Sequence, residues 1–405
     1  MRADGCGGRW RSFIWAVAVV GAVAAAEREP RRSAGCTNPE DPPIRPGDEA
    51  AFSIEVDGLT RTYIMKLPEG YTHADPVPLV LSFHGWRGTA LGQKQKDRLD
   101  EVADDETFAV AWADGYGDHH SGEGSWNSWN AVGSSRSPGI EGPTCTVNED
   151  FCYASCEARP QRCDRCDWTT CVNDVGFVEG LLHALEATYC LDLNRLYATG
   201  FSNGGMFSWQ VGQSLGHLFA AVAPGGGQPF VGFVQPPNLT GGHRIPLLDF
   251  HGEGDIVCPP YGGESGGSSD TGGWIYAAVS HGTRVWAEAH GCNGRDTVFR
   301  TPYDDYVTCY KHGECADGAE FVRCLWDGGH VWPQLPSEVE GSRLVWWFFT
   351  QHPFIPPQGP PANRSQLYRS RSTPARLDWT AYRNAALVNS ANRTAAVLSG
   401  RAALS

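Results

Sequence analysis

The sequence predicts an α/β fold in which helices cover both faces of one large, mostly parallel sheet. Short, continuous apolar runs such as PLVLSF (78–83) and FAVAW (108–112) are typical of strands buried on both faces. Between such runs lie segments with helical periodicity, for example the one marked by Phe177, Leu181 and Leu185. Residues 37–353 are enough for one domain with a full core.

The expected elements alternate along the chain. The first is a β-hairpin, whose strands 52–56 and 61–67 flank the turn Asp57-Gly58. The buried strands expected after it are 78–83, 108–112, 195–199, 219–224, 246–251 and 321–326. The expected helices are 90–105, 177–189, 205–213, 275–289 and 344–349.

Both ends of the chain differ from this body. Basic residues precede the apolar run Phe13 to Ala26, which ends in Ala24-Ala25-Ala26, so residues 1–26 are predicted to be a secretory signal peptide. The alternative is a buried N-terminal helix. Residues 354–405 are first Pro-rich and then rich in Arg, Ser and Ala, and we expect a weakly ordered tail.

Charge and hydropathy exclude some partners. The formal net charge is −14 and the body of the chain has no basic run, which argues against binding to nucleic acid or anionic lipid. No segment after residue 26 has 18 uninterrupted apolar residues, so no membrane association is expected after cleavage. We expect a secreted, extracellular monomer.

The cysteines indicate an oxidising compartment. Six of the 14 fall in one loop, 145–171, and in a secreted chain they are expected to form mainly internal disulfides that stiffen this insertion. Zinc binding is the alternative role for Cys163, Cys166 and Cys171, whose spacing allows it, although the loop has no His. The other expected set, whose members pair among themselves, is Cys292, Cys309, Cys315 and Cys324. Three N-glycosylation sequons begin at Asn238, Asn363 and Asn392.

Three serines occur in the pattern G-x-S-x-G, namely Ser202, Ser214 and Ser265. A catalytic nucleophile needs a strand before the serine, a helix after it and small neighbours at the sharp turn between them. Ser202 follows the strand 195–199 and meets these conditions. Ser214 lies within or beyond the same helix, and Ser265 lies in a Gly/Ser loop with no preceding strand. Ser202 is therefore the predicted nucleophile.

The predicted base and acid follow later strands. His330 lies in DGGHVWP, directly after strand 321–326, and Asp255 follows strand 246–251, with Glu253 as the alternative acid. The order Ser, Asp, His is that of the α/β-hydrolase fold. The expected oxyanion donors are the backbone N–H groups of Asn203 and Trp86, and His84 is expected to support the turn before Trp86. No metal or cofactor is required.

Motifs between residues 50 and 353 resemble secreted esterases of the polyhydroxybutyrate depolymerase-like and feruloyl esterase-like type (carbohydrate esterase family 1). The matching motifs include FHGWRG, SWNSWN, NRLYATGFSNGGMFS, DFHGEGDIVCPPY, GGHVWP and WWFFTQHP. By position, the resemblance assigns the nucleophile to Ser202, the acid to Asp255 and the base to His330. The long Cys-rich loop and the Ser/Gly loop 262–273 depart from the family pattern, and no polymer-binding module is expected in residues 354–405.

The predicted function is hydrolysis of carboxylic esters through an acyl-enzyme. Trp126, Trp129 and Trp332 are expected to border the cleft, which favours feruloyl or acetyl esters of polysaccharides. Core packing is the alternative role for these tryptophans. Hydroxyalkanoate esters are the alternative substrates, and peptidase or thioesterase chemistry could use the same triad. A further alternative is a non-catalytic extracellular binding protein on a hydrolase scaffold.

Overall fold

The computed structural model describes residues 29–38, 41–118, 126–146, 153–157, 166–267, 272–315, 318–354 and 373–387. The predicted signal peptide and the sequons at Asn363 and Asn392 lie outside these ranges. Among the described segments, no helix is both long and apolar enough to cross a lipid bilayer.

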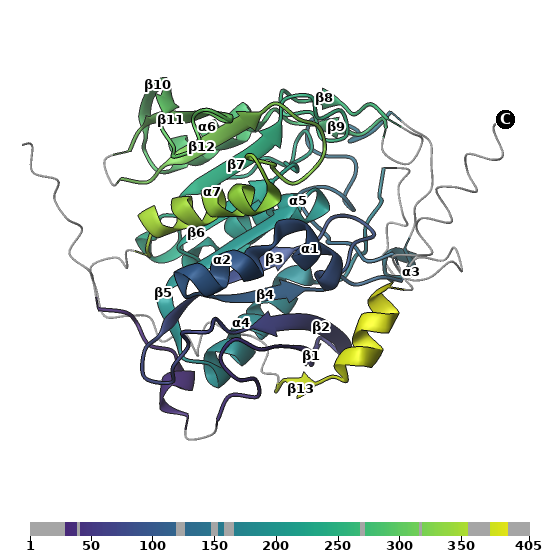
Figure 1. The fold of residues 1–405 in the computed structure, drawn as a ribbon. Helices are drawn as coiled ribbons and strands as arrows, with labels where there is room; N and C mark the ends of the chain where they lie inside the picture. The colour runs from purple at the N-terminus through teal and green to yellow at the C-terminus, as the bar shows by residue number, and fades with distance from the viewer. Residues whose placement is uncertain are drawn as a thin grey trace, which may run out of the picture.

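One sheet runs through the middle of the domain (Figure 1). In the described residues it has 11 strands, in the order β10-β11-β12-β7-β6-β5-β3-β4-β2-β1-β13. The strands on the N-terminal side are β1 (Glu49–Val56), β2 (Leu59–Lys66), β3 (Val77–Phe83) and β4 (Ala109–Ala113). Those that follow are β5 (Leu191–Phe201), β6 (Ala221–Gly225), β7 (Leu247–Gly252), β10 (Asn293–Phe299), β11 (Val307–Glu314), β12 (Phe321–Trp326) and β13 (Ala375–Arg376). The six strands from β12 to β4 pair in parallel, which confirms the predicted mostly parallel sheet.

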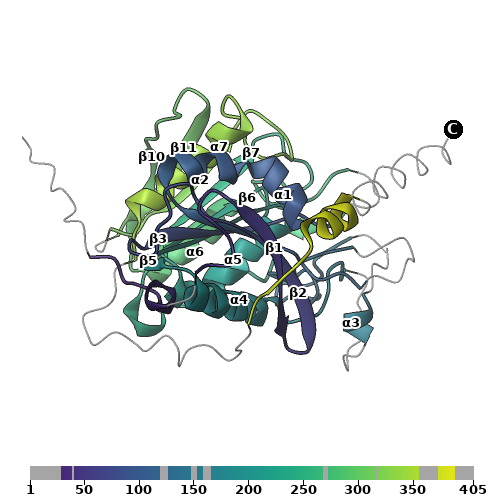
Figure 2. The ribbon, with the colours of Figure 1, turned by 60° about the horizontal axis from the view of Figure 1, so that its bottom comes forward.

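Helices cover both faces of the sheet (Figures 1 and 2). On one face lie α1 (Ala90–Asp97), α2 (Leu99–Glu106) and α7 (Glu338–Gln351), which pack on a shared apolar cluster. On the other face lie α4 (Asp174–Thr188), α5 (Asn203–Leu215) and α6 (Val279–Ala289), which pack on a second cluster. The remaining short elements are α3 (Ala154–Glu157), η1 (Ala34–Thr37), η2 (Gly216–Leu218), η3 (Thr240–Gly242) and the strand pair β8 (Gly263–Glu264) and β9 (Ile275–Tyr276). This is the architecture of the α/β-hydrolase fold expected from the sequence.

Three details differ from the expected elements. The single helix expected over 90–105 is two helices, because Arg98 adopts a left-handed conformation with φ of 49° between them. Ile275 and Tyr276, expected as the first turn of a helix, form β9, and α6 begins only at Val279. The edge strands β10 and β11 were not expected. β10 is almost wholly exposed and carries charged residues, so it lacks the apolar run that marks a buried strand.

Part of the expected weakly ordered tail belongs to the folded domain. Ala375 and Arg376 pair with β1 in antiparallel register, and residues 379–387 form a helix (yellow in Figure 2). The hydroxyl of Tyr382, in that helix, donates to Oδ2 of the buried Asp114 at 2.7 Å. These contacts are long-range, and the polar tail sequence has no periodicity that would signal them.

Candidate active site

Ser202 stands on a sharp turn between β5 and α5. Its backbone has φ of 59° and ψ of −121°, a strained conformation for a residue with a side chain. Glycines make the turn possible, because a Cβ on Gly204 would collide with the carbonyl oxygen of Phe83 in the neighbouring strand. The N–H of Ser202 donates to the oxygen of Gly225 at 2.9 Å, which ties the turn to the end of β6. The predicted strand–serine–helix context is therefore present.

The structure brings Ser202, His330 and Asp255 into one hydrogen-bonded chain. Oγ of Ser202 lies 2.9 Å from Nε2 of His330, and Nδ1 of His330 lies 2.7 Å from Oδ2 of Asp255. The other carboxylate oxygen of Asp255 accepts from the N–H groups of Val257 and Cys258, both at 2.9 Å. Because a carboxylate only accepts, Nδ1 of His330 carries a proton, and in the neutral ring Nε2 is then free to accept the proton of Ser202.

The turn after β3 lies directly against this serine. A Cβ added to Gly85 would be 3.2 Å from Cβ of Ser202, so the backbone leading to Trp86 passes beside Ser202. The buried side chain of His84 supports this turn. Its Nε2 accepts from the N–H of Gly115 at 2.8 Å, and its Nδ1 lies 2.7 Å from the oxygen of Gly85. Asn203 begins α5 on the other side, where backbone N–H groups point outward.

The competing residues have other contacts. Oγ of Ser214 accepts from the side chain of Gln210 within α5 at 2.8 Å. Oγ of Ser265 accepts from the N–H of Trp274 at 2.9 Å. The carboxylate of Glu253 accepts from the hydroxyl of Tyr261 at 2.8 Å rather than from His330.

A pocket of 260 Å³ opens at Ser202 and His330. Aromatic side chains form much of its wall, among them Trp86, Trp168 and Trp274. Trp168 contacts both of the others edge-on, with ring centroids 5.4 Å from Trp86 and 6.1 Å from Trp274. A larger hollow of 710 Å³, bounded mainly by residues 41–48 and 71–73, includes none of these residues.

Two of the three tryptophans predicted to border the cleft are instead core residues. Trp129 is fully buried, stacks on Phe207 at 4.7 Å, and has its backbone N–H and carbonyl bonded to the side chain of Asn203. Trp332 is 1% exposed and packs against Phe250, 5.2 Å away. For these two residues the predicted substrate contact is wrong, because both rings are buried among core side chains and neither lines the pocket.

The third, Trp126, lies beside the pocket rather than in its lining. Its ring contacts that of Trp86 edge-on at 5.7 Å, and the guanidinium of Arg87 lies 3.4 Å from the Trp126 ring centre. Its contact with the pocket is therefore through Trp86.

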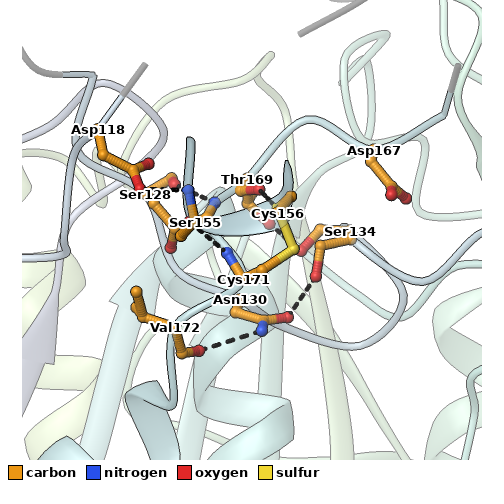
Figure 3. Close-up of a disulfide and its surroundings, with 12 residues drawn as sticks. Asp118, Ser128, Asn130, Ser134, Ser155, Cys156, Asp167, Thr169, Cys171 and Val172 are labelled. Atoms are coloured by element: carbon orange, nitrogen blue, oxygen red, sulfur yellow. Dashed lines mark hydrogen bonds between the residues drawn. A yellow bond between two sulfur atoms is a disulfide. The ribbon is translucent and has the colours of Figure 1, made fainter. Parts of the chain in front are cut away.

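The Cys-rich insertion forms part of the pocket wall. Cys145–Cys166 and Cys156–Cys171 are disulfides, and Trp168 lies between two of these cysteines in the chain. Figure 3 shows Cys156–Cys171 within a network of polar contacts, including the bond from the N–H of Cys171 to Oγ of Ser155 at 3.0 Å. These two disulfides confirm the internal pairing expected for four of the six cysteines, whereas Cys152 and Cys163 lie outside the described residues. The pairing excludes Cys166 and Cys171 as zinc ligands.

The same insertion holds Trp86 in place. The indole N–H of Trp86 donates to the hydroxyl of Tyr153 at 2.9 Å. Burial raises the pKa of Tyr153 to about 12, so the phenol stays neutral. The insertion therefore stabilises the wall of the pocket at Trp86.

Three further disulfides lie elsewhere in the described residues, and they are Cys36–Cys190, Cys292–Cys315 and Cys309–Cys324. The last two confirm the pairing expected among the four C-terminal cysteines. Cys258 is a free, buried thiol beside Asp255. Within the described residues, no group of three or more His, Cys, Asp and Glu side chains is arranged to hold a metal ion.

No protein-family model matches this chain, but its sequence is similar to those of several known proteins. Feruloyl esterase B of Piromyces equi is 24% identical over 300 residues, which cover 73% of this chain and 46% of that protein. The putative esterase NocK of Nocardia uniformis subsp. tsuyamanensis is 28% identical over 239 residues, 56% of this chain and 55% of that protein. The bifunctional acetylxylan esterase/xylanase XynS20E of Neocallimastix patriciarum is 23% identical over 184 residues, 44% and 19% of the two chains.

The chain is a distant relative of feruloyl and acetylxylan esterases. This confirms the resemblance to feruloyl-type esterases seen in the motifs. The chain spans about half the length of the first two relatives.

Proposed function

We propose that the protein is a serine esterase that hydrolyses feruloyl or acetyl esters of plant polysaccharides, with a preference for the feruloyl group. The observation that carries the proposal is the hydrogen-bonded chain of Ser202, His330 and Asp255 at the mouth of an aromatic pocket. Similarity to feruloyl and acetylxylan esterases supports the same substrate class.

In the proposed reaction, Nε2 of His330 takes the proton of Ser202 as its Oγ attacks the ester carbonyl. The N–H groups of Asn203 and Trp86 stabilise the oxyanion, each by about 10²–10³-fold in rate. His330 then protonates the leaving alcohol and activates a water that hydrolyses the acyl-enzyme. Asp255 stabilises the imidazolium throughout.

The pocket favours an aromatic acyl group over an acetyl group. The pocket of 260 Å³ is lined by the rings of Trp86, Trp168 and Trp274. A flat hydroxycinnamoyl group can fill this space, whereas an acetyl group would leave most of it empty. A flexible aliphatic hydroxyalkanoate chain would make fewer ring contacts.

The substrate proposal is tested by comparing kcat/KM for methyl ferulate, an acetylated xylo-oligosaccharide and a 3-hydroxybutyrate oligomer. We expect the highest value for methyl ferulate. A tenfold preference for the 3-hydroxybutyrate oligomer would overturn the polysaccharide-ester proposal and leave the serine mechanism in place.

The catalytic proposal is tested separately with a serine-directed fluorophosphonate. We expect one adduct, on Ser202, in the folded protein. Absence of an adduct would favour a non-catalytic binding protein on the same scaffold.

We also propose that the protein is secreted. Five disulfides join the described residues, and such density is typical of proteins that fold in an oxidising compartment. The charged and apolar pattern of residues 1–26 fits a signal peptide. Mass analysis of the protein recovered from the medium should show a mature N-terminus near Glu27.

A further inference from the structure

A second histidine–carboxylate pair is buried next to the proposed acid. His251 lies at the end of β7, four residues before Asp255, and its Nδ1 is 2.5 Å from Oδ1 of Asp249. The side chains of His251 and Asp249 are 0% and 1% exposed. Oδ2 of Asp249 also accepts from the indole N–H of Trp209 at 3.3 Å. The proposed reaction uses neither residue.

The contacts of Gln228 determine the protonation of this histidine. Nε2 of Gln228 is 2.8 Å from the oxygen of Pro259 and 3.4 Å from that of Ala277, so the NH₂ group must face these two carbonyl acceptors. Oε1 of Gln228 consequently faces His251, 3.1 Å from its Nε2. Both ring nitrogens of His251 therefore face acceptors, and both donate only if the ring is a protonated imidazolium.

The same contacts join three parts of the site. Gln228 lies in the loop after β6, whose Gly225 accepts from the N–H of Ser202. Pro259 lies in the loop that carries Asp255, and Ala277 follows Tyr276 in the pocket wall. Gln228 bridges these segments, and His251 is the partner of its amide oxygen.

We propose that His251 is a permanently protonated positioning residue for the proposed ester hydrolysis. Its imidazolium, neutralised by Asp249, donates to the amide oxygen of Gln228 and so helps Gln228 to hold the loop that presents Asp255 to His330. The positioning role rests on the proposed function, whereas the protonation state of His251 is independent of that function.

The surrounding charges favour the cation. Burial alone disfavours a charged ring, but the carboxylate of Asp249, and at longer range that of Asp255, raise the pKa of His251 above its ordinary value. The other titratable groups in this cluster, Cys258 and Tyr276, are neutral because burial raises the pKa of each. The ring therefore faces two carboxylates and no competing cation among the groups that contact it in the described residues.

The protonation state is tested by NMR of protein labelled with ¹⁵N-histidine, with His251→Gln used to assign the signal. We expect both ring nitrogens of His251 to remain protonated from pH 6 to pH 9. A ring that loses one proton in this range, or that has an unprotonated nitrogen throughout, overturns the proposal. This result does not depend on catalysis.

The positioning role is tested by kinetics of His251→Gln and of the double variant Asp249→Asn/His251→Gln, which buries no unpaired charge. We expect both to lower kcat by about 10- to 100-fold with KM changed less than twofold, because the geometry at Asp255 is lost while the pocket remains. The matched control is His243→Gln, at a histidine that is 3% exposed and bonded to the oxygen of Phe219.

Three outcomes separate the alternatives. An unchanged kcat in the double variant, or an equal loss in His243→Gln, would show that the pair serves only general stability. Absence of ester hydrolysis by the unmodified protein would refute the proposed function and leave the NMR result to decide the state of His251.

Discussion

Oδ2 of Asp255 lies 2.7 Å from Nδ1 of His330, although 75 residues separate the two in the chain. The sheet brings them together: β7 and β12 are parallel neighbours, so the loops that follow them leave the same edge side by side. The side chain of Asp255 is 1% exposed and accepts two backbone N–H groups, which fixes its orientation. This contact determines which nitrogen of His330 faces Ser202.

Asp255→Asn should lower kcat for ester hydrolysis by about 10⁴-fold with little change in folding, because an amide permits the wrong tautomer of His330. Glu253→Gln is the control and should behave as the unmodified protein, since Glu253 contacts Tyr261. Steady-state kinetics and circular dichroism measure the two effects. A large loss of kcat in Glu253→Gln with no loss in Asp255→Asn would assign the role of catalytic acid to Glu253 instead of Asp255.

Trp168→Ala should lower kcat/KM for methyl ferulate more than for an acetyl ester, because it removes the ring between Trp86 and Trp274. Trp332→Ala should instead lower the free energy of unfolding by about 3–5 kcal/mol, because it leaves a cavity in the core. Denaturant titration together with the two substrates distinguishes the effects. Equal losses on both substrates in Trp168→Ala would contradict an acyl-binding role.

Replacing Cys156 and Cys171 together with serine should cost about 3 kcal/mol of stability and also weaken the preference for methyl ferulate. The matched control is the pair Cys309 and Cys324, which also has a sequence separation of 15 but lies between β11 and β12. Its loss should cost similar stability without changing substrate preference. If both double replacements changed the substrate preference equally, the insertion would have no specific role in shaping the pocket.

The thiol of Cys258 should resist iodoacetamide at pH 8 in the native protein and react after unfolding. It is fully buried, and burial raises the pKa of this thiol, so very little reactive thiolate is present. Peptide mapping after alkylation measures the modified fraction. Rapid native alkylation would show that the pocket opens far enough to expose Cys258.

The parallel core and the positions of Ser202, Asp255 and His330 could be predicted because local patterns specify them. Buried strands are continuous apolar runs, and each of the three residues lies in the turn or loop that follows one. The pocket wall could not be predicted in the same way. Trp168 and Trp274 lie in loops with no periodicity. Disulfides and long-range hydrogen bonds, such as that from the N–H of Trp168 to the oxygen of Ser134, determine their positions. Composition alone does not distinguish these rings from the core residues Trp129 and Trp332.

The most direct test of the central claim is kcat for methyl ferulate hydrolysis by Ser202→Ala, with Ser214→Ala as the matched control in the same helix–turn segment. We expect Ser202→Ala to fold normally and to lose about 10⁶-fold in kcat, whereas Ser214→Ala keeps full activity. Retention of activity in Ser202→Ala, or its loss in Ser214→Ala alone, would contradict the assignment of Ser202 as the nucleophile.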